Sequence, residues 1–147
     1  MEDNSIHFHS VKVAGRRWYE LKAPLYLADC GIHNFMFSNE VIDLTMDGEL
    51  TLSAGFRWNG RSGGAIDTIS AIRSSAFHDA LYELIYLKVL PRQTRVLADR
   101  MMRKLDDDDG VNVVRQWYSY ALLRAFGDLR SKYIAVTLGK KHIKPVL

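Results

Sequence analysis

The chain has 147 residues, of which 48% are hydrophobic and 25% are charged. These values are ordinary for a globular protein and argue against the disordered and fibrous classes. A chain of this length predicts a single domain over residues 1–147. No apolar stretch approaches the roughly 18 residues of a membrane span, and no signal-peptide pattern opens the chain. We therefore expect a cytoplasmic protein with no transmembrane segment.

The net charge of +3 comes from the C-terminal end of the chain. Residues 132–147 contain four lysines and no acid, and without those four charges residues 1–131 carry −1. A short basic end is typical of a solvated terminus. We therefore predict a basic tail over residues 131–147 and no nucleic-acid partner. The single cysteine, Cys30, excludes an internal disulfide and is expected to be buried.

Residues 11–58 form a β-rich region, in which short apolar runs are separated by turn residues. Aromatic and β-branched residues are frequent in these runs, which is typical of strands. The segment Met46-Asp-Gly-Glu predicts a hairpin turn, because Asp-Gly tolerates positive φ. The runs begin at Trp18, Leu25, Phe35, Val41 and Leu50. This pattern predicts an N-terminal antiparallel β-meander.

A glycine-rich loop at residues 59–64 separates the strands from a helical region at residues 67–127. Apolar residues from Ala71 to Ile85 keep helical spacing, and this first helix should end before Pro91, which disfavours helical geometry in the residue that precedes it. The short connection that follows predicts that the next helix is its antiparallel neighbour.

The second predicted helix begins after Thr94 as its N-cap and has an apolar face that ends at Leu105. The four acids at residues 106–109 are expected in a solvated turn, because acids at a helix C-terminus oppose the macrodipole. A third helix is predicted from Val111 to a stop at Gly127. The fold class is therefore α+β, a β-meander followed by a helical hairpin and a third helix.

Four polar residues are expected to cluster on the helical hairpin. His78 and Tyr82 share one face of the first helix, Asp79 is rotated by about 100° from them, and Asp99 can face His78 from the second helix. A histidine bound to a carboxylate has a fixed tautomer, and its other ring nitrogen can act as a base. His78 and Asp99 therefore form a candidate catalytic dyad, with Tyr82 as its support.

A calcium site is the candidate metal centre. An exposed carboxylate beside loop carbonyl oxygens is the ligand set that Ca²⁺ prefers, and the cation would polarise a substrate carbonyl or phosphate. The candidate ligands are Asp79, Asn59, Gly60 and Gly63.

The segment Phe77-His-Asp-Ala-Leu-Tyr82 resembles the His-Asp-x-x-Tyr motif of phospholipase A2, in which a glycine-rich calcium loop precedes the motif. Here Gly63 and Gly64 precede His78 by a similar interval, and Asp99 follows it by 21 residues. In small prokaryotic members of that family, the aspartate that orients the histidine lies at about this distance. The resemblance implies water activation by His78, orientation of its ring by Asp99 and a calcium ligand at Asp79.

A longer pattern covers roughly residues 15–130. It comprises Phe56-Arg-Trp-Asn-Gly-Arg-Ser-Gly-Gly, the His78 motif, Ala98-Asp-Arg and Ala125-Phe-Gly, and it resembles a largely phage-borne family of unknown function, number thirteen fifty-three. The loop of that family is Trp-Asp-Gly-x-Ser-Gly-Pro. Asn59 replaces its Asp and Gly64 its Pro, which removes one negative charge from a calcium site and should weaken binding. The resemblance implies a phage or prophage origin.

Two hypotheses follow for the function. The first is a phage-encoded ester hydrolase of the phospholipase A2 type, assisted by Ca²⁺ and acting on a lipid or another ester. The alternative is a non-catalytic phage accessory or virion-associated domain that binds a phage or host protein. In that case Arg100 could pair with Asp79 across the hairpin and give a structural salt-bridge network. Either protein is expected in the host cytoplasm or on the virion.

Overall fold

The computed structural model describes residues 6–59 and 69–110, which contain seven strands followed by two α-helices. The strands are β1 (Phe8–Val13), β2 (Arg16–Leu21), β3 (Leu25–Leu27), β4 (Phe37–Ser38), β5 (Ile42–Leu44), β6 (Leu50–Leu52) and β7 (Arg57–Trp58). The helices are α1 (Ile69–Tyr86) and α2 (Arg95–Asp108), and a 3₁₀ turn, η1 (Arg92–Thr94), leads into α2. The predicted α+β class and the order of strands before helices are confirmed.

The strands form two antiparallel sheets instead of the single meander that was predicted. The first sheet has the order β1-β2-β7, and the second has the order β3-β6-β5-β4. Only β4, β5 and β6 follow one another as in a meander. The difference arises because β3 pairs with β6 and β2 pairs with β7, and neither partner is its neighbour in the sequence.

The predicted hairpin turn lies between β5 and β6. Gly48 has φ of +87°, and its amide donates to the Thr45 carbonyl at 3.1 Å. A side chain at this position would also collide with its surroundings, because a Cβ atom would lie 2.7 Å from Cδ2 of His33. The turn prediction is therefore confirmed, and glycine is favoured there by its positive φ, while a Cβ atom would also displace the exposed side chains of His33 and Asp29.

The core lies between the sheets and α1. In β3, β5 and β6 the first and third residues are buried, as expected for strands with one covered face. Trp18 and Trp58 are both fully buried, and the Nε1 atom of Trp58 donates to Oγ of Ser75 at 3.1 Å. This bond fixes the end of β7 against α1, so the residue that follows, Asn59, lies close to the helix that carries His78.

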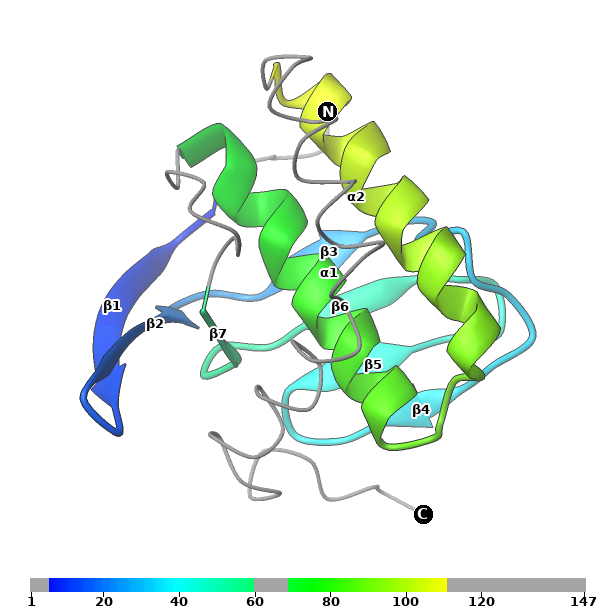
Figure 1. The fold of residues 1–147 in the computed structure, drawn as a ribbon, viewed down its shortest axis with the longest axis horizontal. Helices are drawn as coiled ribbons and strands as arrows, with labels where there is room; N and C mark the ends of the chain where they lie inside the picture. The colour runs from blue at the N-terminus through cyan, green and yellow to red at the C-terminus, as the bar shows by residue number, and fades with distance from the viewer. Residues whose placement is uncertain (1–5, 60–68, 111–147) are drawn as a thin grey trace.

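The two helices lie side by side and antiparallel, in front of strands β3 to β6 (Figure 1). Helix α1 ends before Pro91, as predicted, and Lys88 takes a positive φ of 62° in the turn that follows. Thr94 precedes α2, but its hydroxyl donates to the Pro91 carbonyl at 2.6 Å and does not cap the helix. The helical hairpin is confirmed, whereas the third predicted helix lies outside the described residues.

The prediction that the acids at residues 106–109 lie in a solvated turn holds only in part, because Asp107 and Asp108 are exposed but belong to the last turn of α2. Helix α2 continues through Asp106 and Asp107 to Asp108, and Asp106 is fully buried. Neither α1 nor α2, the two α-helices of the described part of the chain, has the length and apolar character that a membrane crossing requires.

Candidate functional site

Helix α1 is buried on all sides between residues 71 and 84, although many of its residues there are polar. A buried polar group without a hydrogen-bond partner costs about 1–3 kcal/mol, so each of these side chains needs a specific neighbour. The residues concerned are Arg73, Ser74, Ser75, His78, Asp79, Tyr82 and Glu83.

His78 and Asp99 meet between the two helices. The Nε2 atom of His78 lies 2.8 Å from Oδ1 of Asp99, and the Tyr82 hydroxyl donates to the same oxygen. His78 and Tyr82 are one helical turn apart, and their ring centres are separated by 4.1 Å. All three side chains are at most 1% exposed. The structure therefore brings together the three residues predicted to be catalytic.

The contact with Asp99 fixes the chemical state of both its donors. Because the acceptor is a carboxylate, Nε2 of His78 is the ring nitrogen that donates, and in a neutral ring Nδ1 keeps its lone pair. Burial, followed by the hydrogen bond to Asp99, raises the pKa of Tyr82 above its usual value of 10.0. The tyrosine hydroxyl thus stays protonated and remains a donor.

The second ring nitrogen of His78 faces Asp79. Nδ1 lies 3.8 Å from Oδ1 of Asp79, which is too long for a hydrogen bond. An unprotonated nitrogen in this state can accept a proton from water. Asp79 itself is 0% exposed, so the expectation of an exposed carboxylate at this position is wrong.

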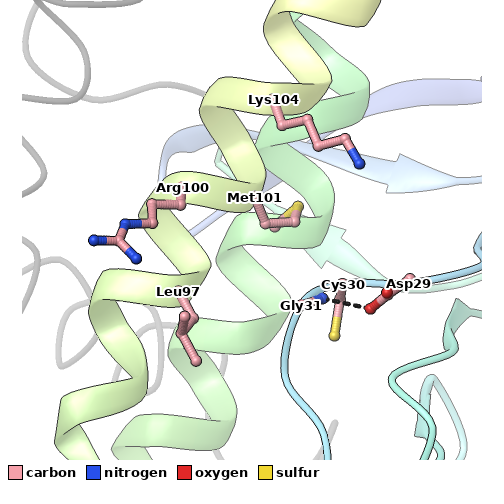
Figure 2. A pocket seen from close by; sticks show the side chains of 7 residues that line it. All are labelled: Asp29, Cys30, Gly31, Leu97, Arg100, Met101 and Lys104. Carbon is pink, nitrogen blue, oxygen red and sulfur yellow. Dashed lines mark hydrogen bonds between the residues drawn. The ribbon is translucent and has the colours of Figure 1, made fainter.

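Arg95 is the cation beside the cluster, whereas sequence reasoning selected Arg100. The Arg95 guanidinium lies close enough to Tyr82 to favour its ionised form, which partly opposes the rise in the pKa of Tyr82. Arg100 is exposed and lines a pocket of about 200 Å³ between α2 and the Asp29–Gly31 loop, where its side chain points away from α1 (Figure 2). The proposed pair between Arg100 and Asp79 is therefore not formed.

Glu83 is a further buried acid that sequence reasoning missed. It lies one helical turn after Asp79, is 1% exposed, and its Oε2 atom has no hydrogen-bond partner within the described part of the chain. Burial, and secondly the negative charge of Asp79, raises the pKa of Glu83 well above its ordinary value. The spacing of four residues on a helix was visible in the sequence, but the burial was not.

A second polar contact joins the same two helices near the start of α1. Ser74 donates to Oδ1 of Asp106, and Nη1 of Arg73 lies 3.1 Å from Oδ1 of Asp109. These contacts explain why the acids of residues 106–109 are not all solvated. They also fix the alignment of the helices that places His78 opposite Asp99.

The predicted calcium ligands are only partly within the described chain. Gly60 and Gly63 lie outside it, while Asn59 directly follows β7 and Asp79 lies on α1. No group of three or more His, Cys, Asp or Glu side chains within residues 6–59 and 69–110 could hold a metal ion. Asp79 and Asn59 nevertheless provide oxygen donors of the hard type that Ca²⁺ prefers.

Comparisons of the chain with protein-family models, with curated proteins and with solved structures give no match. The resemblances to phospholipase A2 and to the phage-borne family therefore remain predictions from the motifs alone.

Proposed function

We propose that His78 and Asp99 are the general-base dyad of an ester hydrolase that resembles phospholipase A2. The observation that carries this proposal is the 2.8 Å contact between His78 Nε2 and Asp99, which directs Nδ1, the nitrogen that is unprotonated in a neutral ring, toward Asp79. General-base catalysis of this kind typically contributes about 10²–10⁴ to the rate. The substrate class is a lipid ester or another carboxylic ester.

In the proposed reaction, Nδ1 of His78 takes a proton from a water molecule while the water oxygen bonds to the ester carbonyl carbon. The negative charge of Asp99 stabilises the imidazolium that forms. The tetrahedral intermediate then collapses, the carbon–oxygen bond to the alcohol breaks, and the leaving oxygen takes the proton from Nδ1. The products are a carboxylic acid and an alcohol, and the histidine returns to its starting state.

The intermediate also needs stabilisation of its oxyanion. A calcium ion held by Asp79 and Asn59, with carbonyl oxygens at Gly60 and Gly63, would polarise the ester carbonyl. Asn59 provides no negative charge, so we expect millimolar rather than micromolar calcium to be needed. Because the His78 ring is 1% exposed, the chain around it must open before a substrate can reach Nδ1.

The test is hydrolysis of short-chain phosphatidylcholine and of a nitrophenyl ester, each with calcium and with a chelator. The matched variants are His78→Asn, which removes the base, and Arg100→Met, which changes an exposed residue of α2. We expect His78→Asn to reduce the rate at least about 10²-fold, and Arg100→Met to leave it unchanged. Full activity of His78→Asn would end the proposal.

A second function is favoured by the burial of the His78 ring. A ring at 1% exposure, held by Asp99, is also what a purely structural polar network requires. The protein would then be a non-catalytic phage accessory or virion-associated domain that binds a protein partner. Under this alternative His78→Asn lowers the free energy of unfolding by about 1–3 kcal/mol, and the wild-type protein hydrolyses neither ester.

A further inference from the structure

The pocket between α2 and the Asp29–Gly31 loop contains none of the residues of the polar cluster around His78. Its volume is about 200 Å³, which is below the roughly 300–1,000 Å³ of pockets for drug-sized ligands. An apolar cavity of roughly 150 Å³ is nevertheless large enough to hold benzene. A ligand of this pocket would therefore be a small molecule, of the size of one ring with a head group.

Part of the pocket lining is apolar. Leu97 of α2 is 36% exposed, although most apolar residues of this helix are buried. Met101 and Cys30 also line the pocket, and both are buried. On the loop side, no heavy atom beyond the chain neighbours of Gly31 lies within 4 Å of the place that a Cβ atom would take. The lining thus offers an accessible apolar contact for the body of a ligand.

Two cations of α2 line the same pocket. Arg100 and Lys104 are exposed, lie one helical turn apart, and form no salt bridge or hydrogen bond with the described part of the chain. Like charges at this spacing repel each other. Oδ1 of Asp29, the acid of the lining, accepts from the Gly31 amide and from Nε2 of His33, each at 2.8 Å. Two positive charges and one negative charge leave +1, which a bound anion would balance.

We propose that this pocket binds a small amphiphilic carboxylate, with its anionic head group on Arg100 and its apolar body against Leu97 and Met101. Arg100 extends away from the Asp29–Gly31 loop, whereas Lys104 extends toward the side of that loop (Figure 2). A head group on Arg100 therefore avoids the negative charge of the loop. A guanidinium can also donate two parallel hydrogen bonds to one carboxylate, which an ammonium group cannot. This inference goes beyond the proposed hydrolase and does not depend on it.

The first measurement is a titration of the wild-type protein with benzoate, benzamide and acetate, followed by the amide NMR signals of Gly31, Leu97 and Met101. Benzamide has the shape of benzoate without its charge, and acetate has the charge without the ring. We expect saturable shifts with benzoate, and binding at least about tenfold weaker for the other two compounds. Equal binding of benzamide or of acetate would overturn the assignment of an amphiphilic anion. The absence of saturable shifts with benzoate would overturn the binding site itself.

The second measurement repeats the benzoate titration with Arg100→Met, Lys104→Met and Lys12→Met. Lys12 is an exposed cation of β1 that does not line the pocket, so its variant is the matched control for loss of one charge. We expect the Kd to rise at least about tenfold in Arg100→Met, less in Lys104→Met and not at all in Lys12→Met. An unchanged Kd in Arg100→Met, or an equal rise in all three variants, would contradict the proposed site.

Discussion

The sheets and the helical pair of this protein are held together by different kinds of contact. The inner faces of β3, β5 and β6 contribute leucine and isoleucine side chains only, and each is at most 8% exposed. The interface of α1 with α2 instead buries an imidazole, a phenol and several carboxylates. Polar groups in such a position are weak contributors to stability, since apolar residues of similar volume often serve as well or better. The polar groups at the helical interface are those that the proposed dyad requires, and they are also those of the structural network proposed as the alternative.

The largest effect is expected from removal of the central acceptor in the helical pair. Asp99→Ala leaves both His78 and Tyr82 without the oxygen to which they donate. We expect the free energy of unfolding to fall by about 3–5 kcal/mol, as for a broken buried pair. Unfolding by urea measures this free energy, and the control is Asp43→Ala on the exposed face of β5. A fall no larger than that of the control would contradict the polar network described here.

The apolar packing of the sheets is tested by Leu50→Ala in β6. Leu50 is 0% exposed, so the variant loses both its burial and the packing around it, and we expect a loss of about 2–5 kcal/mol. Unlike the Asp99 variant, this one should leave the His78 ring spectrum unchanged. A shift of that spectrum would mean that the packing of the sheets and the polar contacts of the helical pair depend on each other.

The contact between the sheets and the helical pair is tested by Ser75→Ala, because Ser75 of α1 accepts a hydrogen bond from Trp58 of β7. The change leaves Nε1 of the buried Trp58 without the acceptor that it now has. We expect a loss of about 1–3 kcal/mol in the free energy of unfolding. Trp58→Phe in the same background removes the unsatisfied donor, and the two changes together should therefore cost less than their sum. Strict additivity would show that the hydrogen bond contributes nothing.

Glu83 gives the most specific expected effect, because it appears only as a dependence of stability on pH. Its folded pKa is raised, while in the unfolded chain it is close to the ordinary 4.5. The folded state thus binds the proton more tightly, and this contribution to stability is complete below pH 4.5 and declines as the pH rises toward the folded pKa. The decline can approach about 1.4 kcal/mol per pH unit.

Glu83→Gln should remove that decline. The stability of the variant relative to the wild type should therefore be greater at pH 8 than at pH 5. Unfolding by urea at several pH values gives the slope for both proteins. Parallel slopes would show that Glu83 is solvated in the folded protein and that its burial is not as described.

The sequence predicted the strands better than their pairing. A short apolar run between turn residues is a local property of the sequence, and Leu25, Ile42 and Leu50, from three of the predicted runs, each lie in a strand. The partners of β2 and β3 depend on how distant segments pack. No local pattern near Trp18 indicates that β2 pairs with β7.

The candidate site could be predicted for the same local reason. The spacing of His78 and Tyr82, together with a short connection, was enough to place Asp99 opposite the histidine. Arg95 follows from the same antiparallel register, because it faces Tyr82, but its charge was overlooked in favour of Arg100. Asp106 was missed because a run of acids is usually solvated, and its buried partner Ser74 has no distinctive pattern.

The most direct test of the account is the protonation state of the His78 ring in the wild-type protein, measured by nitrogen NMR between pH 6 and pH 9. The account predicts a neutral ring with its proton on Nε2, held by Asp99, and an unprotonated Nδ1. A neutral ring with its proton on Nδ1 would contradict it, because the nitrogen assigned to activate water would then have no lone pair to offer.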